Sequence, residues 1–231
     1  MPPSTSPASP RPPDETARFG LDALEGFYRL HASIYDWTRP FLLVGRREAV
    51  RALALRPGER VLDVGCGTGW SLPRLFARGA RVVGIEPSGP MRRQAAARLA
   101  RRGLSGVVDL DPRPYGSHAE YEGGVDAVLF SYSLSMIPPF EEVLERARLD
   151  LRPGGRIAVV DFLDAWGPVG FGLRRSHVHL GPERLHSLRR LFPRHHEAIR
   201  SVGLWRHFLF EGSREVTGLS PVGRGSVGGP R

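Results

Sequence analysis

The sequence predicts an α/β fold in which helices cover both faces of one mainly parallel sheet. Short apolar runs, several of them closed by glycine, alternate with helical patterns of about ten residues. This alternation is typical of consecutive strand–helix–strand units. A chain of 231 residues is long enough for one such domain and short for two. We therefore expect a single doubly wound domain.

The two ends of the chain differ in composition from the part between them. Residues 1–16 are rich in proline and serine, and residues 217–231 in glycine, serine and proline. Both segments are predicted to be disordered tails, which leaves residues 17–216 as the folded domain. Ahead of the first strand, apolar side chains recur at helical spacing, at Phe27, Leu30, Ile34, Trp37 and Phe41. This stripe predicts an N-terminal helical lid over the ligand-binding edge of the sheet.

Strands and helices then alternate along the chain. The predicted strands are residues 60–65, 81–86, 105–111, 125–131 and 155–162. Residues 204–212 are predicted to form a closing strand, for which an antiparallel orientation is left open. The predicted helices are residues 71–79, 90–103, 140–151 and 182–192. A Pro-Gly-Gly sequence at residues 153–155 predicts the turn before the fifth strand. Helices between successive strands indicate parallel pairing for most of the sheet.

The charge balance is basic but does not predict a nucleic-acid partner. The formal net charge is +9, and all 33 basic residues are arginine, with neither lysine nor asparagine in the chain. Such an absence is typical of codon bias rather than of selection for a phosphate-binding surface. The arginines are also scattered along the predicted helices. We expect solvated helix faces and no binding of nucleic acid.

The cysteine count and the hydropathy of the chain predict that disulfides, metal sites and stable membrane insertion are absent. Cys66 is the single cysteine, so the sequence predicts no disulfide framework and no cysteine-based metal cluster, and no metal site is expected. No apolar run reaches about 18 residues, so no stable insertion into a membrane is expected. The N-terminus lacks the apolar core of a signal peptide, and a cytoplasmic location is therefore expected. No pattern indicates an oligomeric state.

A glycine-rich turn follows the first predicted strand in "VLDVGCGTG", residues 61–69. Glycines let the backbone pass close to a ligand while amide groups point toward it. Glu86 ends the next strand, 21 residues after Gly65, about where a doubly wound fold places an acid on ribose hydroxyls. The glycine spacing differs from the dinucleotide pattern G-x-G-x-x-G. Asp63, inside the strand, fits a ligand that carries an ammonium group.

These motifs, with "LRPGGRIAVVDF" at residues 151–162, resemble the class I S-adenosylmethionine-dependent methyltransferase family over residues 60–162. The resemblance implies a Rossmann-like, seven-stranded sheet and S-adenosylmethionine as the cofactor. It also implies that the glycine loop accepts the methionine part, that Glu86 holds the ribose and that Asp111 or a neighbour meets the adenine. The residues implied in cofactor binding are Asp63, Gly65, Gly67, Gly69, Glu86, Pro87, Asp111, Ser131 and, from the lid, Tyr28 and Tyr35.

A narrower resemblance concerns the acceptor. "FYRLHASIYDWTRPFLL", "SYSLSMIP" and "VVDF" are similar to the methyltransferases that build the betaine-lipid head group by N-methylation of a homoserine amine. This resemblance implies an amine acceptor, either a small molecule or a lipid head group.

The segment "SYSLSMIPP", residues 131–139, contains hydroxyl groups but no acid, histidine, cysteine or lysine. Because the cofactor carries its own leaving group, such a site needs only to align a nucleophile within about 3–3.5 Å for in-line displacement. Ligands bind at the carboxyl ends of strands in open α/β sheets. The candidate catalytic residues are Ser131, Tyr132, Ser135 (which shares a face with Ser131 if the segment is extended) and His31 from the lid.

Three carbons are bonded to the sulfonium, which leaves alternatives open. Attack at the methyl group is transfer of a methyl to the acceptor, and this is the expected reaction. Attack at the methionine-side carbon would release methylthioadenosine, with aminocarboxypropyl transfer or cyclisation to azetidine-2-carboxylate. A non-catalytic module that binds S-adenosylmethionine and a Rossmann oxidoreductase are further alternatives.

Overall fold

The computed structural model describes residues 43–117 and 121–215. The predicted lid, with Tyr28, His31 and Tyr35, lies outside the described residues, and so do both predicted tails. The structural statements below concern the described part of the chain.

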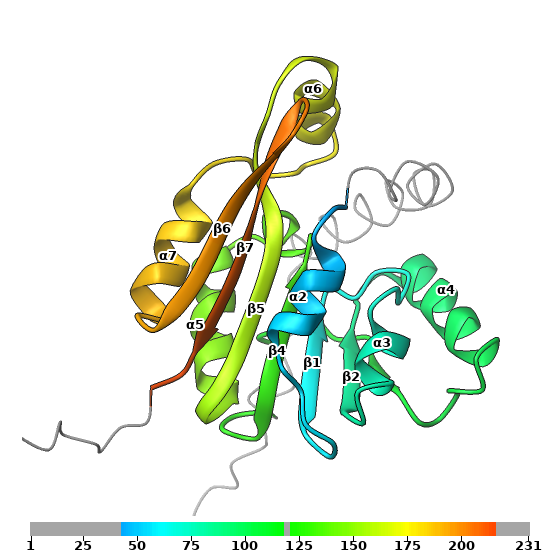
Figure 1. The fold of residues 1–231 in the computed structure, drawn as a ribbon. Coiled ribbons are helices and arrows are strands. Elements are labelled where there is room, and N and C mark those ends of the chain that lie inside the picture. Colours follow the sequence, from blue (N-terminus) through cyan, green and yellow to red (C-terminus); the bar gives the residue numbers. More distant parts are fainter. Residues whose placement is uncertain (1–42, 118–120, 216–231) are drawn as a thin grey trace, which may run out of the picture.

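Seven strands form one sheet in the order β3-β2-β1-β4-β5-β7-β6, which confirms the predicted doubly wound α/β class (Figure 1). Strands β1 to β5 are parallel, whereas β7 and β6 pair antiparallel. The strands are β1 (Arg60–Val64), β2 (Arg81–Ile85), β3 (Asp109–Asp111), β4 (Val125–Ser131), β5 (Leu151–Ala165), β6 (His195–Val202) and β7 (Trp205–Ser213).

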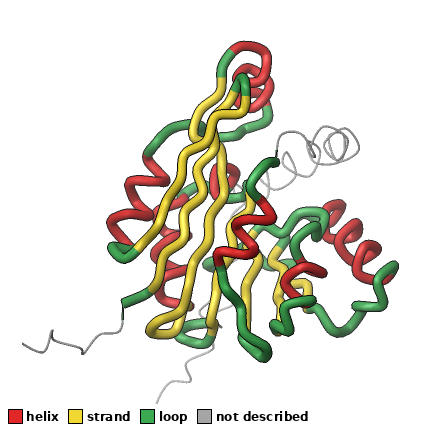
Figure 2. The backbone as a smooth tube through the Cα atoms, viewed as in Figure 1, coloured by secondary structure: helices red, strands yellow, loops and turns green. Residues whose placement is uncertain are grey.

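Helices cover both faces of the sheet, as Figure 2 shows in red on either side of the yellow strands. The core on one face contains side chains of α2, α3 and α4, and the core on the other contains side chains of α5 and α7. Because both faces are covered, the central strands are buried along almost their whole length. The helices are α2 (Arg46–Ala52), α3 (Leu72–Phe76), α4 (Gly89–Ala100), η1 (a 3-10 turn, Leu134–Met136), α5 (Phe140–Asp150), α6 (Gly167–Arg175) and α7 (Glu183–Leu191).

The strand order reverses between β1 and β4, whose carboxyl ends lie side by side. In open parallel sheets such a reversal leaves a crevice beyond the strand ends, where ligands bind. The glycine-rich turn after β1, the end of β2 and the "SYSLSMIPP" segment after β4 all lie at this edge. The topology therefore brings the three predicted motifs to one place.

Two features differ from the sequence predictions. The turn expected at residues 153–155 is a bulge inside β5, because the register with β4 shifts there from Val125↔Leu151 to Ala127↔Arg156. Three elements, α2, α6 and β6, were not predicted. Each has a weak local signal: α2 has only seven residues, α6 contains three glycines, and most of the β6 side chains are exposed and polar.

Candidate functional site

The glycine loop requires glycine for both conformation and space. Gly65, Gly67 and Gly69 have φ angles of 66°, 57° and 72°, in the left-handed region that disfavours residues with a side chain. A methyl group at Gly65 would lie 2.5 Å from Ser133 Cβ, and one at Gly69 would lie 2.9 Å from Ala95 Cβ. The loop is therefore wedged between the segment after β4 and helix α4, with its backbone available to a ligand.

Asp63 is fully buried at the carboxyl end of β1. Its Oδ2 accepts a hydrogen bond from the Ser71 hydroxyl, whereas Oδ1 has no partner among the described residues. Burial raises the pKa of Asp63 to about 6, against the lowering effects of the Ser71 bond and of the Arg46 charge. An orphaned, buried carboxylate oxygen calls for a donor, and an ammonium group of a ligand would supply one.

Glu86 follows β2 and faces the glycine loop. Its carboxylate accepts hydrogen bonds from the Gly67 amide, at 2.8 Å, and from the Ser88 amide, at 2.9 Å. The side chain is buried, which fixes its carboxylate beside the loop backbone. Pro87, the next residue, is exposed at the rim of the same edge. This arrangement fits the implied role of Glu86 as an acceptor for ribose hydroxyls.

Asp111 ends β3 and is held by protein groups. Arg113 donates to both carboxylate oxygens, at 2.9 and 2.7 Å, and the Tyr121 hydroxyl donates at 2.9 Å. These hydrogen bonds, with the Arg113 bonds first, hold the pKa of Asp111 well below its usual range. The carboxylate is therefore ionised and already paired, and its contact with adenine stays a prediction.

The chain turns sharply after β4. Tyr132 has a φ of 57°, an unfavourable value for a bulky residue, and its hydroxyl donates to the Val44 carbonyl at 2.7 Å. Its ring packs on Phe162 with centroids 4.6 Å apart. Burial raises the pKa of Tyr132 above its usual value, so the phenol stays protonated at neutral pH. Tyr132 is thus anchored beside the site and is a poor general base.

The three serines of this segment have different surroundings. The segment is not extended, because residues 134–136 form the 3-10 turn η1. Ser131 Oγ accepts a hydrogen bond from Arg46 Nε at 3.1 Å, at the ligand edge. Ser135 is buried and donates through Oγ to Asp161 Oδ1 at 2.7 Å, while its amide donates to Oδ2 at 2.7 Å. Ser133 donates through Oγ to the Val64 carbonyl at 2.6 Å, beside the glycine loop, so the three serines face three different partners.

Two carboxylates at the end of β5 are engaged elsewhere. Asp161 is fully buried under the η1 turn, where burial raises its pKa. Asp164 pairs with Arg206 on the surface, with Oδ1 accepting from Nε at 2.9 Å. Neither carboxylate is presented to the ligand edge.

Arg46 is a site residue that the sequence analysis did not single out. Its guanidinium stacks on Trp70 of the glycine loop, 4.3 Å from the ring centroid, while Arg74 lies 3.8 Å from the same ring. Arg46 also contacts Ser131 and lowers the pKa of Asp63. It lies 85 residues from Ser131 in the sequence, and no local pattern distinguishes it from the other arginines.

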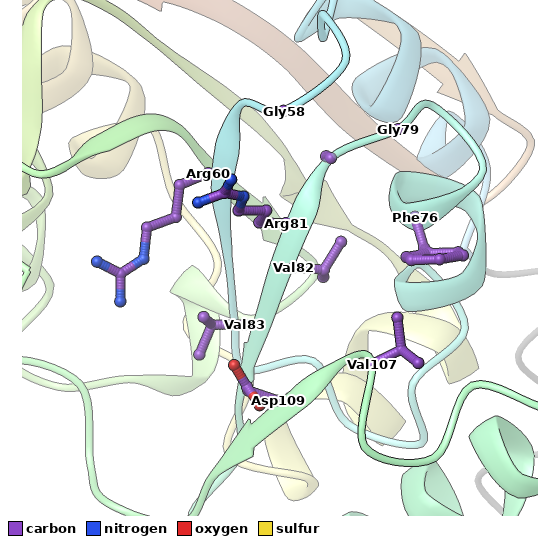
Figure 3. Close-up of a pocket in the computed structure, with 10 residues that line it drawn as sticks. Gly58, Arg60, Phe76, Gly79, Arg81, Val82, Val83, Val107 and Asp109 are labelled. Atoms are coloured by element: carbon purple, nitrogen blue, oxygen red, sulfur yellow. The ribbon is translucent and has the colours of Figure 1, made fainter.

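A separate groove of about 480 Å³ lies where the parallel strands begin, at the end of the sheet opposite to the glycine loop (Figure 3). It is lined at the amino ends of β1 and β2 by residues that include Arg60, Phe76, Arg81, Val82 and Val107. Its place at the amino ends separates it from the glycine loop, so we do not assign the cofactor to it. In residues 43–117 and 121–215 no cluster of potential metal ligands is present, and no helix of these residues is long and apolar enough to cross a membrane.

The described residues at the carboxyl edge fit S-adenosylmethionine. The left-handed loop provides backbone close to a ligand, the orphaned oxygen of Asp63 suits the ammonium of a methionine moiety, and Glu86 suits the ribose. The neutral Tyr132 and the Ser131 hydroxyl border the same edge.

Comparison with known proteins gives the same assignment. Residues 62–157 match the family model "Methyltransferase domain". The chain is 39% identical over 140 residues to a protein-L-isoaspartate O-methyltransferase of Methylorubrum populi, covering 60% of this chain and 59% of that protein. It is 29% identical over 156 residues to a 2-phytyl-1,4-naphtoquinone methyltransferase of Synechococcus elongatus, covering 64% and 67%.

A solved structure resembles the fold over nearly the whole chain. It is the 1,6-didemethyltoxoflavin-N1-methyltransferase of Burkholderia thailandensis with bound 1,6-didemethyltoxoflavin and S-adenosylhomocysteine. The TM-score is 0.64 at 21% identity, with 93% of this chain and 94% of that chain covered. The matched region spans about three fifths of the length of the first of the curated relatives. Residues 62–157 are therefore similar to a methyltransferase domain, and the fold is similar to that of a solved methyltransferase.

Proposed function

We propose that this protein transfers the methyl group of S-adenosylmethionine to an amine of a small molecule or a lipid head group. The observation that supports the proposal most directly is the buried, half-partnered Asp63 beside a left-handed glycine loop. When bound, the cofactor supplies a methyl group on a sulfonium, together with its own leaving group.

The described side chains at this edge favour alignment over proton abstraction. Tyr132 keeps its proton at neutral pH, and its hydroxyl is already engaged by Val44. The Ser131 hydroxyl accepts from Arg46 and can orient a neighbouring donor such as an amine. A neutral amine needs no strong base before it attacks, so an amine acceptor suits these groups.

The positive charge of Arg46 limits which amines suit the site as acceptors. A guanidinium beside Ser131 repels a permanent cation and attracts an anion. An acceptor that combines a neutral amine with a carboxylate or phosphate would place the anion on Arg46 and the amine near Ser131. This places amino acids and head groups that combine an amine with an anion ahead of simple alkylamines.

The first experiment is mass spectrometry of the purified full chain incubated with S-adenosylmethionine, with and without a panel of amines. We expect S-adenosylhomocysteine to be released only when an amine is present, and most with an amine that also carries an anion. Glu86→Ala should abolish the release because the cofactor is no longer held. Methylthioadenosine together with azetidine-2-carboxylate, formed without an acceptor and absent with Glu86→Ala, would instead identify attack at the methionine-side carbon.

Arg46→Met tests the acceptor class, with the carboxamide analogue of the best acceptor as its match. The variant should raise KM for the carboxylate form about tenfold or more and leave KM for the carboxamide unchanged, since one charge-assisted pair is lost. An equal effect on both acceptors would show that Arg46 does not bind the anionic group.

A further inference from the structure

Helix α6 and the turn between β6 and β7 form a protrusion at the edge of the sheet that carries the glycine loop. Figure 1 shows α6 and this turn together beyond the end of β5, away from the layers of the sheet. The Trp166 amide donates to the Leu204 carbonyl at 2.9 Å, which ties the start of α6 to the turn. We call α6 with Trp166 and Leu204 the α6 tip.

Large apolar side chains are exposed on the α6 tip. The exposed fractions are 73% for Phe171, 48% for Leu204 and 47% for Trp166. Phe171 has the largest value among the exposed large hydrophobic residues of the described chain. Scattered single apolar residues are ordinary on a protein surface, but a group of them on a protrusion indicates an interaction site.

The packing of α6 fixes which of its faces is exposed. Gly170 is buried, and a methyl group added there would lie 2.4 Å from the Ala165 carbonyl oxygen. Close approach at Gly170 therefore holds one face of α6 against the end of β5. Arg174, at i+4 from Gly170, reaches back over that glycine, with its guanidinium 3.0 Å from the position of the added methyl group. Phe171 and Arg175, at i and i+4, share the outward face.

The charged residues in and around α6 are all positive. Between residues 165 and 182 the chain has two arginines, Arg174 and Arg175, and no aspartate or glutamate. Both arginines are exposed, and neither forms an ion pair with a described carboxylate. An apolar protrusion flanked by unneutralised guanidinium groups is complementary to a surface that is apolar beneath and anionic on top.

We propose that the α6 tip docks on the surface of an anionic lipid bilayer. Aromatic side chains such as Phe171 and Trp166 partition into the interface between head groups and acyl chains, and arginines pair with anionic head groups. A patch for a second protein would need a partner that is acidic and apolar at once, whereas an anionic bilayer supplies both properties. Docking would turn the ligand edge of the sheet toward the membrane.

The proposal does not depend on the identity of the acceptor, because vesicle binding needs no turnover. The test is co-sedimentation of the full chain with vesicles of phosphatidylcholine containing about 30% phosphatidylglycerol, and with vesicles of phosphatidylcholine alone. We expect binding to the anionic vesicles and at least fivefold weaker binding to the neutral ones. Phe171→Ser and the double variant Arg174→Ser/Arg175→Ser should each weaken binding to the anionic vesicles at least fivefold.

Matched controls separate docking from general charge attraction. Arg101→Ser/Arg102→Ser removes the same charge beyond the C-terminal end of α4, and Val107→Ser removes an apolar side chain that is 51% exposed near the amino edge of the sheet. Both should bind the anionic vesicles as the parent does. Absence of vesicle binding by the parent would overturn the proposal, and so would equal weakening in the controls. A dimer that light scattering detects in the parent and not in Phe171→Ser would assign the α6 tip to self-association instead.

Discussion

At the scale of single residues, Asp63 joins stability to function. Its carboxyl group is buried without a full set of partners, and burial raises its pKa from 3.8 to about 6. The unfolded chain loses this proton near pH 4 but the folded chain only near pH 6. The contribution of Asp63 to stability is therefore largest below pH 4, where the buried carboxyl group is protonated. This contribution is lost as the pH rises through about 6, where the group ionises in the folded chain.

Asp63→Asn should raise the free energy of unfolding at pH 7 by up to about 3 kcal/mol, because about two pKa units correspond to that energy. Most of the gain should disappear at pH 4, where the folded parent is protonated and the unfolded chain is about half protonated. Urea unfolding at pH 4 and pH 7 measures the difference. A variant less stable than the parent at pH 7 would show that the Ser71 bond outweighs the burial of the charge.

Asp63→Asn should weaken cofactor binding, although it is expected to stabilise the fold. If the carboxylate holds the ammonium of S-adenosylmethionine, the Kd of the parent should increase about tenfold per pH unit below about 6. Asp63→Asn should bind at least tenfold more weakly at pH 7, with a Kd that is flat between pH 5 and 8. Isothermal titration calorimetry across this range gives both values, and a flat profile for the parent would exclude the role.

Gly65 and Gly103 form a matched pair for the requirement for glycine. Both have left-handed φ angles, of 66° and 67°, but a methyl group meets Ser133 at Gly65 and nothing within 4 Å at Gly103. Gly103→Ala should lower the free energy of unfolding by about 1 kcal/mol from conformation alone. Gly65→Ala should lose about 1–3 kcal/mol more through the clash. Equal losses in thermal unfolding would show that the loop adapts.

At the scale of elements, the η1 turn depends on strand β5 for its position. Asp161 accepts from the Ser135 hydroxyl, the Ser135 amide and the Phe162 amide, all inside the protein. This one carboxylate thereby joins the segment after β4 to the next strand of the sheet. The position of Ser131 and Tyr132 at the ligand edge rests on that junction.

Asp161→Ala should lower the free energy of unfolding by about 3 kcal/mol or more, since three buried donors lose their acceptor. Ser135→Ala removes one donor and should cost about 1 kcal/mol, with an unchanged Kd for S-adenosylmethionine. Urea unfolding and cofactor titration test both. A Ser135→Ala variant that keeps its stability and loses turnover would support the predicted catalytic role of Ser135.

At the scale of the whole molecule, positive charge accumulates on the side of α3 and α4. Between residues 64 and 108 the only acidic residue is Glu86, against eight arginines, at positions 74, 78, 81, 92, 93, 98, 101 and 102. Arg74 has its pKa lowered by burial and by the charges of Arg47, Arg102 and Arg98. These arginines are separate in the sequence, and the fold makes them neighbours. Mutual repulsion is the expected consequence.

Salt should therefore stabilise the protein. Raising sodium chloride from 20 to 500 mM shortens the screening length to a few ångströms and should raise the Tm by about 2–4 °C. Arg101→Ser/Arg102→Ser should raise the Tm at 20 mM salt and reduce the further gain from salt. Differential scanning calorimetry at the two salt concentrations makes the test. A Tm independent of salt in both proteins would mean that repulsion on this face is negligible.

The sequence by itself determined the parallel sheet and the glycine loop, because both depend on local properties. Apolar runs at strand spacing predict β1, β2 and β4, and the spacing of Gly65, Gly67 and Gly69 sets the turn whatever surrounds it. Glu86 is predicted as a cofactor-binding residue from its separation along the chain from that turn. The weaker elements α6 and β6 escaped prediction because glycine-rich and polar segments become ordered only through packing on the sheet.

Only the tertiary structure decided how the polar groups are paired. Ser131 and Ser135 look equivalent in the sequence, yet one meets Arg46 and the other Asp161, across separations of 85 and 26 residues. The raised pKa of Asp63 likewise results from burial, which no local pattern measures. Backbone conformation follows largely from near neighbours in the chain, whereas hydrogen-bond partners and desolvation are set by residues that only the fold brings together.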